Sequence, residues 1–271
     1  MPNLFDVMLN AASLTGELRH GSMKSFVTAT SFVDNGRVES QDAFIGGTLF
    51  IPKNNSTHLV TAFDQTADKV TYSPAASPTP SANDGYMITA IDRDSLVDII
   101  NNALLIMGRY VTKTEVTADV KAGNDSNVIQ LPSTISDIID IEEYVGGSQY
   151  NLLTNWDEVQ DEDGLYTYVY AKYSGYTVAI PGSTEDKVYR ITYMKPHPRV
   201  YKDDDIIMTP YHAARVAMEA AYAYYFQRMA IKGNADDKET MMFQTLQLNI
   251  AQLRAAYPVR HKQKAYKVAR F

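Results

Sequence analysis

The 271-residue chain contains no cysteine, which excludes disulfide bonds, thiolate nucleophiles and cysteine-based zinc sites. It has no run that approaches the roughly 20 apolar residues of a membrane-spanning helix. Residues 1–6 lack a basic region and an apolar core, so we expect no secretory signal here. Basic residues are also in deficit, with 25 Lys and Arg against 32 Asp and Glu. That balance argues against a protein that coats DNA, because phosphate binding needs dense positive charge.

Signatures of enzyme active sites are missing as well. No two of the five histidines have the spacing of a metal-binding pair on a helix, and there is neither a Gly-rich phosphate loop nor a Gly-x-Ser-x-Gly elbow. Residues 159–170 match a calcium loop only in the middle, because Val159 and Tyr170 stand where the outer ligands belong. The run Asp203-Asp204-Asp205 fits a solvated loop better than an ion site, since successive side chains diverge. We predict a protein that is not an enzyme and has no cofactor.

What the sequence does contain is an uneven distribution of charge. The last 32 residues carry six cations and no acid, so the preceding residues carry a net charge of −13. Residues 122–171 contain no Lys or Arg. This indicates different neighbours at the two ends of the molecule, although a solvated acidic loop beside a frayed cationic terminus fits equally well. The acids that we call the acidic strip are Asp137, Asp140, Glu142, Glu143, Asp157, Glu158, Asp161, Glu162 and Asp163.

Apolar residues at spacings of three to four predict helices over residues 4–18, 94–109, 210–232 and 237–257. Asn3 or Asp6 can start the first helix, and Gly16 or Gly21 can stop it. Gly108 ends the second helix, and Thr209 followed by a proline begins the third.

The last two predicted helices are separated by residues 233–236 only. So short a connection makes them antiparallel neighbours. We expect contacts across this pair between Tyr222, Tyr225 and Met229 on one helix and Leu246, Ile250 and Leu253 on the other.

Two regions of short apolar runs separated by turn residues predict strands. In residues 22–90 the runs are 25–32, 48–51, 59–63 and 69–72, which suggests a small β-sandwich or barrel. In residues 114–195 they are 128–131, 138–145, 152–159, 165–171, 176–180 and 187–194. The alternation of the last run places Tyr189, Ile191 and Tyr193 on one face of a sheet. The tyrosines of 165–171 suit a core or a subunit interface better than a sugar platform.

These elements predict an α+β fold: a helical bundle with an inserted antiparallel β-sheet, preceded by a β-sandwich or barrel-like module. We divide the chain into residues 1–90 (first helix and β-rich module), 91–257 (helical bundle with the β-region 114–195) and 258–271 (basic tail).

From residue 92 to 257 this order of parts resembles the head–tail connector (adaptor) proteins of tailed double-stranded DNA bacteriophages. The first 90 residues resemble a β-module common in phage virion proteins. Neither match is a residue signature. The first resemblance rests on residues 103–108, 128–131, 138–145, Trp156, 189–194 with Lys195-Pro196-His197-Pro198, 203–205 and 213–225. The second rests on residues 46–51, 60–64, 69–73 and 82–88.

The resemblance implies a structural virion protein in the neck, assembled in the host cytoplasm. It would form a homo-oligomeric ring, commonly a dodecamer, beneath the portal protein, contact tail or neck proteins and pass DNA through its centre without specific binding. Neither a cofactor nor a membrane is implied. Other phage neck or tail roles (terminator, tube or fibre attachment) and a DNA- or glycan-binding accessory module are the alternatives.

Two surfaces follow from this interpretation. The acidic strip is expected to face the DNA channel or solvent, because acids that repel one another without cations between them are tolerated in water. The C-terminal tail is expected to insert into the portal, although phosphate binding would use the same charges. The residues of that tail are Arg260, Lys262, Lys264, Tyr266, Lys267, Arg270 and Phe271.

Overall fold

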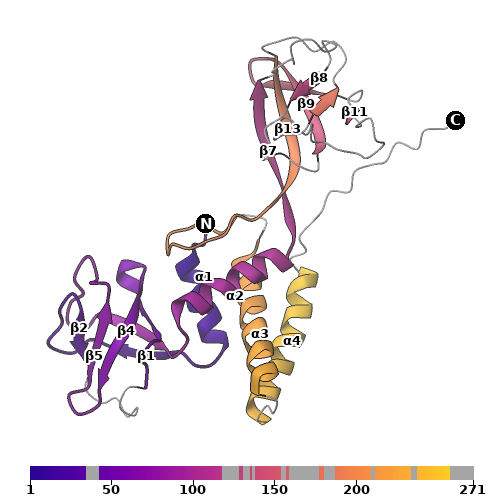
Figure 1. Cartoon of the computed structure of the whole chain (residues 1–271). Helices are drawn as coiled ribbons and strands as arrows, with labels where there is room; N and C mark the ends of the chain where they lie inside the picture. Colours follow the sequence, from indigo (N-terminus) through magenta and orange to yellow (C-terminus); the bar gives the residue numbers. More distant parts are fainter. Residues whose placement is uncertain are drawn as a thin grey trace. The chain divides into compact units, whose positions relative to one another are not determined.

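The computed structural model combines helices with antiparallel sheets, so the predicted α+β class is confirmed (Figure 1). By their internal contacts the described residues form two compact units. The first comprises those of Met1–Gly108 and Pro198–Val259, and the second those of Arg109–His197. The first unit therefore contains both the N-terminal sheet and the three later helices, which the predicted boundary at residue 90 separates from it. The structure describes residues 1–34, 43–117, 128–130, 135, 138–153, 157–158, 177–179, 187–208, 211–232 and 237–256.

Helices α1 and α2 begin at cap residues that are visible in the sequence. Asn3 caps α1 (Leu4–Leu14), where its side chain accepts a hydrogen bond from the amide of Asp6 at 3.0 Å. Asp92 caps α2 (Arg93–Ile106) by accepting from the amide of Ser95 at 2.8 Å. The predicted stop glycines Gly16 and Gly108 follow these helices with φ of +69° and +87°, a backbone region that glycine adopts without strain.

Helix α3 (Ala213–Lys232) contacts each of the other three helices of the first unit, including α4 (Asp237–Ala256). Its small residues Ala217, Ala220 and Ala221 are fully buried, which lets neighbouring backbones approach closely. Both helices occur where the spacing predicts them. The predicted start of α3 at Thr209 lies outside the described residues, as do residues 233–236.

The N-terminal sheet of the first unit has six antiparallel strands. Beyond its edge strand β1, the amides of Lys24 and Ser25 donate to the carbonyl of Val33, at 2.8 and 3.3 Å, and so link this segment to the other edge strand, β2. A 3-10 turn, η1 (Pro52–Asn54), joins two of the strands. In sheet order the strands are β1 (Arg19–Ser22), β6 (Gly85–Thr89), β3 (Thr48–Ile51), β4 (Ser56–Asp64), β5 (Lys69–Ser73) and β2 (Ser31–Val33).

The predicted strands at 48–51, 59–63 and 69–72 are confirmed, but the predicted strand at 25–32 is wrong. Only β2 forms there, because the hydroxyl of Thr28 accepts from the amides of Thr30 and Ser31 and folds the segment into a turn. Phe26 is also in the left-handed region, with φ of +48°, where a strand cannot continue. The strand β1 is absent from the prediction, since its sequence Arg-His-Gly-Ser has no apolar alternation.

In the second unit β13 (Val188–Pro196) is the central strand, and it pairs with β7 (Arg109–Thr117) and β9 (Ile138–Gly146). The predicted face of Tyr189, Ile191 and Tyr193 is confirmed, because all three are buried together. The predicted run 152–159 divides between two strands, and the predicted strand 165–171 lies outside the described residues. The remaining strands are β10 (Gln149–Leu152), which pairs with β9, and a separate sheet of β11 (Asp157–Glu158), β12 (Thr177–Ala179) and β8 (Val128–Gln130).

Candidate functional site

The first candidate site is a groove in the first unit, at the start of α2. The guanidinium of Arg93 is held there by three partners: its Nε donates to the hydroxyl of Thr57 at 2.8 Å, and its Nη2 to Asp203 at 2.9 Å and to the carbonyl of Tyr201 at 2.5 Å. Asp203 also accepts from the amide of Thr57, at 2.6 Å. These bonds join β4, α2 and the segment that precedes α3.

The predicted solvated loop at Asp203–Asp205 is therefore a structural element of this groove. Asp203 is partly buried in its ion pair with Arg93, and Asp205 accepts from the amides of Tyr201 and Lys202 at 2.6 and 2.9 Å. These two bonds lower the pKa of Asp205 below its ordinary value. Sequence analysis missed this role because the partners of Asp203 lie more than 100 residues away along the chain.

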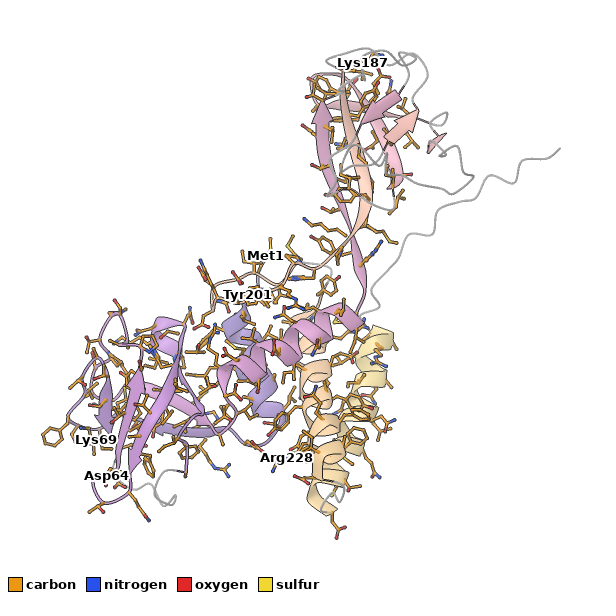
Figure 2. The ribbon with its side chains drawn as sticks, viewed as in Figure 1. Met1, Asp64, Lys69, Lys187, Tyr201 and Arg228 are labelled. Carbon is orange, nitrogen blue, oxygen red and sulfur yellow. The ribbon has the colours of Figure 1, made fainter. Side chains whose placement is uncertain are left out.

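The groove has a volume of about 460 Å³, and both polar and apolar side chains line it. Two large exposed side chains line it: Tyr201, which is labelled in Figure 2 and is 56% exposed, and Leu59, which is 46% exposed. We call it the Arg93 groove, and its lining residues are Thr57, Leu59, Ser73, Pro74, Asp92, Arg93, Asp94, Tyr201, Lys202 and Asp203.

The second candidate site is the helical hairpin of α3 and α4. The ion pairs between these two helices confirm the prediction that they are antiparallel neighbours. Arg228, late in α3, binds Glu239 at the start of α4 at 2.7 Å (Figure 2). Glu219, early in α3, accepts two hydrogen bonds of 2.7 Å from Arg254 near the end of α4. The hydrogen bond to Glu219 raises the pKa of the Arg254 guanidinium. Since each end of one helix pairs with the opposite end of the other, the two run in opposite directions.

The predicted contacts within this pair are confirmed in part. Tyr225 and Leu246 are buried in one apolar cluster, and Ile250 is buried as well. Tyr222 stacks on Phe243, with 4.8 Å between ring centroids. The sequence prediction did not include Phe243, which lies one helical turn before Leu246.

The outer face of α4 has almost no charge. Between Glu239 and Arg254 the helix carries no Asp, Glu, Lys or Arg, yet Met241 and Leu248 are 70% and 69% exposed. Residues seven apart lie on the same side of a helix, so these two side chains share one face. A surface helix normally presents charged residues to water. This uncharged face is therefore a candidate protein interface.

The acidic strip is partly neutralised within the chain. Glu142 accepts from Arg190 at 2.6 Å and from Lys113 at 3.3 Å, while Glu143 lies 2.7 Å from Lys187 (Figure 2). The hydrogen bond from Arg190 is the main cause that lowers the pKa of Glu142. The three cations lie outside residues 122–171 in sequence: Lys113 is on β7, Arg190 is on β13, and Lys187 directly precedes β13.

That the acidic strip faces the DNA channel or solvent stays a prediction, because most of its other acids lie outside the described residues. Asp140 is half-buried on β9. Asp137 and residues 161–163 lie outside the described residues, as do the side chains of Asp157 and Glu158 and the whole tail 258–271.

His58 is a buried titratable group on β4. Its Nδ1 donates to the carbonyl of Pro74 and its Nε2 bonds the hydroxyl of Ser56, each at 2.8 Å, while the Tyr72 ring lies 5.1 Å away between centroids. Burial lowers the pKa of His58 below 6.5, although the bond to Pro74 and the charge of Asp203 oppose this shift.

We expect stability to depend on pH through His58. Because the folded protein holds the imidazole neutral, the unfolded chain binds the proton first, and stability falls as pH drops from about 6.5 towards the lower folded pKa. A His58→Gln variant should flatten the pH dependence of the urea unfolding midpoint between about pH 7 and 5. The exposed His20→Gln variant should keep the wild-type slope. An unchanged slope in His58→Gln would contradict this role.

None of the described helices is long and apolar enough to cross a membrane. The described residues also contain no group of three or more His, Asp or Glu that could hold a metal ion. Comparison of the whole chain with protein-family models and with curated proteins gave no match.

Proposed function

We propose that this chain is a structural virion protein: a head–tail adaptor of a tailed double-stranded DNA phage that forms a ring, expected to be dodecameric, below the portal and lines part of the DNA channel. In this proposal the four helices form the bundle, the second unit is its inserted sheet and the six-stranded sheet is the barrel-like N-terminal module. Its partners are further copies of itself, the portal protein and tail or neck proteins.

The main support for the adaptor proposal is the way in which the helical core is interrupted. Helices α2 and α3 pack together in the first unit, although the segment between them in sequence, Arg109–His197, forms a unit of its own. A helical core interrupted by an inserted β-unit is the order of parts on which the resemblance to adaptors rests.

The uncharged face of α4 supports assembly with further copies. The cores of protein interfaces are depleted of charge and enriched in methionine and aromatic residues. The exposed Met241 on α4 and Phe226 on α3 are of these enriched types, and the exposed Leu248 and Ile231 beside them are uncharged and apolar. A ring needs two different faces on each subunit, because its contacts run head to tail. We infer that the α4 face of one copy packs on a neighbouring copy.

The charge of the chain suits a channel for moving DNA. Clustered cations would bind successive phosphates and slow their passage. The chain has a net charge of −7, and Lys113, Lys187 and Arg190 are paired with carboxylates of the acidic strip. Pairing with these carboxylates lowers the net positive charge that the three cations present to passing phosphates.

The test is the mass of the purified protein, alone and with purified portal rings. Light scattering should give a ring, and a Met241→Glu/Leu248→Glu variant should remain folded but stay monomeric, because each copy buries two carboxylates at the interface. A Thr61→Glu/Thr66→Glu variant adds the same charge at exposed sites of β4 and of the turn that follows it, and should still assemble. A monomeric wild-type protein with and without portal rings would refute the proposal.

A second arm of the same experiment addresses the tail. Deletion of residues 258–271 should leave a folded protein that no longer co-sediments with portal rings, because the tail supplies both aromatic side chains and cations for docking. Undiminished co-sedimentation would refute portal docking through the tail. Assembly into a ring that binds tail proteins but no portal would favour another neck or tail role.

A further inference from the structure

The Arg93 groove is a rigid site whose walls come from three parts of the chain. Strands β4 and β5 supply Leu59 and Ser73, α2 supplies Asp94, and the segment before α3 supplies Tyr201. The backbone of Tyr201 is fixed on both sides, because its amide donates to Asp205 at 2.6 Å and its carbonyl accepts from Arg93. An exposed aromatic ring is thus held at the groove by a backbone that cannot retract it.

Several polar groups of the groove remain available to a ligand. Thr57, Asp203 and the carbonyl of Tyr201 engage Nε and Nη2 of Arg93, and within the described part of the chain its Nη1 has no hydrogen-bond partner. The same holds, among these residues, for the carboxylate of Asp94 and the ammonium of Lys202. The groove thus offers donors and an acceptor around one exposed ring.

The charge of these groups favours a neutral ligand. The groove is lined by three carboxylates, Asp92, Asp94 and Asp203, and two cations, Arg93 and Lys202, so its net charge is only −1. Asp203 pairs with Arg93, and Asp92 caps α2. An acidic or basic partner would therefore gain little net attraction. A hydroxyl group both donates and accepts, so a ligand with several hydroxyls can use Nη1 of Arg93 and the carboxylate of Asp94 at once.

The sheet argues against an extended peptide in this groove. Peptides that bind a sheet usually pair with an exposed edge strand. Here β4 pairs with β3 and β5, and β5 pairs with β4 and, over residues 69–71, with β2. The amide of Tyr72 also donates to the carbonyl of Thr30 at 2.9 Å, so little free backbone edge remains beside the groove. A peptide backbone would therefore not pair with these strands through a ladder of hydrogen bonds.

We propose that the Arg93 groove binds a neutral oligosaccharide. The Tyr201 ring packs against the apolar C–H face of a sugar, Leu59 and Pro74 extend this contact, and Arg93, Asp94 and Lys202 bind its hydroxyls. A volume of about 460 Å³ lies within the usual range of small-ligand sites and accommodates a short chain of sugar rings.

The proposal is tested by titrating the purified full-length protein with maltotetraose, cellotetraose, mannotetraose and N-acetylated chitotetraose, using saturation-transfer NMR and calorimetry. At least one of them should bind with a Kd of about 1 mM or tighter. Tyr201→Ala and Asp94→Asn should each weaken that binding about tenfold. Both side chains are exposed, so the variants should fold, and Tyr201→Trp should restore affinity by keeping the ring.

The matched control is Phe26→Ala, which removes an exposed aromatic ring from the same unit outside this groove and should bind like wild type. The proposal is overturned if none of the four sugars binds at about 10 mM, or if the Tyr201→Ala and Phe26→Ala variants bind equally well. Preferential binding of hexaglutamate or of oligogalacturonate would also overturn it, because the site would then recognise anions. None of these measurements depends on ring assembly or on the portal.

Discussion

A Glu219→Gln substitution is expected to destabilise the first unit by about 2–3 kcal/mol, because a buried carboxylate loses the charge that strengthens its hydrogen bonds. The Glu219 side chain is only 4% exposed, accepts two hydrogen bonds from Arg254 and lies 3.8 Å from the buried Arg215. The amide of glutamine occupies the same space but carries no charge. Arg254 is half exposed and can turn to water, whereas Arg215 keeps its charge in a buried place without the neighbouring carboxylate.

Thermal unfolding followed by the helical circular-dichroism signal measures this effect. A loss of that size corresponds to a fall in Tm of about 5–10 °C for a unit of this length. The control is Lys53→Met, which breaks the exposed pair of Lys53 with Asp84 and should leave Tm unchanged within error, because exposed ion pairs add little to stability. Equal Tm values for the two variants would show that the Glu219 network does not stabilise the helices.

Truncation of Ile250 to alanine is expected to cost about 2–5 kcal/mol. Ile250 is 4% exposed on α4, and it lies one helical turn after Leu246, which packs with Tyr225 of α3. The substitution removes three buried carbons and leaves a cavity, because the helix pair cannot close around the smaller side chain.

Urea unfolding measures the free-energy difference when both proteins are compared at the same concentration, because assembly makes the midpoint depend on concentration. Leu105→Ala is the matched control, since Leu105 is a similar aliphatic side chain that is exposed on α2. Its unfolding midpoint should be close to that of the wild type. An Ile250→Ala midpoint equal to that of the control would place Ile250 outside the core and refute the packing of this face of α4.

The positions of the four helices follow from local sequence signals. The caps Asn3 and Asp92, the stop residues Gly16 and Gly108 and the apolar spacing of α3 and α4 each act within a few residues. For that reason the four helices are predictable without any knowledge of the tertiary structure. The alternation in β13 is equally local, and it correctly predicts which side of this strand is buried.

Strands that depend on a distant partner were harder to predict. The strand β7 follows Gly108 with a largely polar sequence, and it forms because all nine of its residues pair along β13, about 80 positions later. The strand β1 likewise depends on β6. A ladder of backbone hydrogen bonds needs no particular side chain, so its presence leaves little trace in a single strand's sequence.

By itself, then, the sequence determined the α+β class, the helices and their caps, the antiparallel pairing of α3 with α4 and the buried face of β13. Only the tertiary structure decided that Asp203 bonds to Thr57 and Arg93. It also decided that Glu142 and Glu143 pair with cations of the same chain, and that the uncharged face of α4 is exposed. The physical reason is distance along the chain. Caps and periodicity act over one or two turns, whereas these pairings depend on packing of segments tens to more than one hundred residues apart.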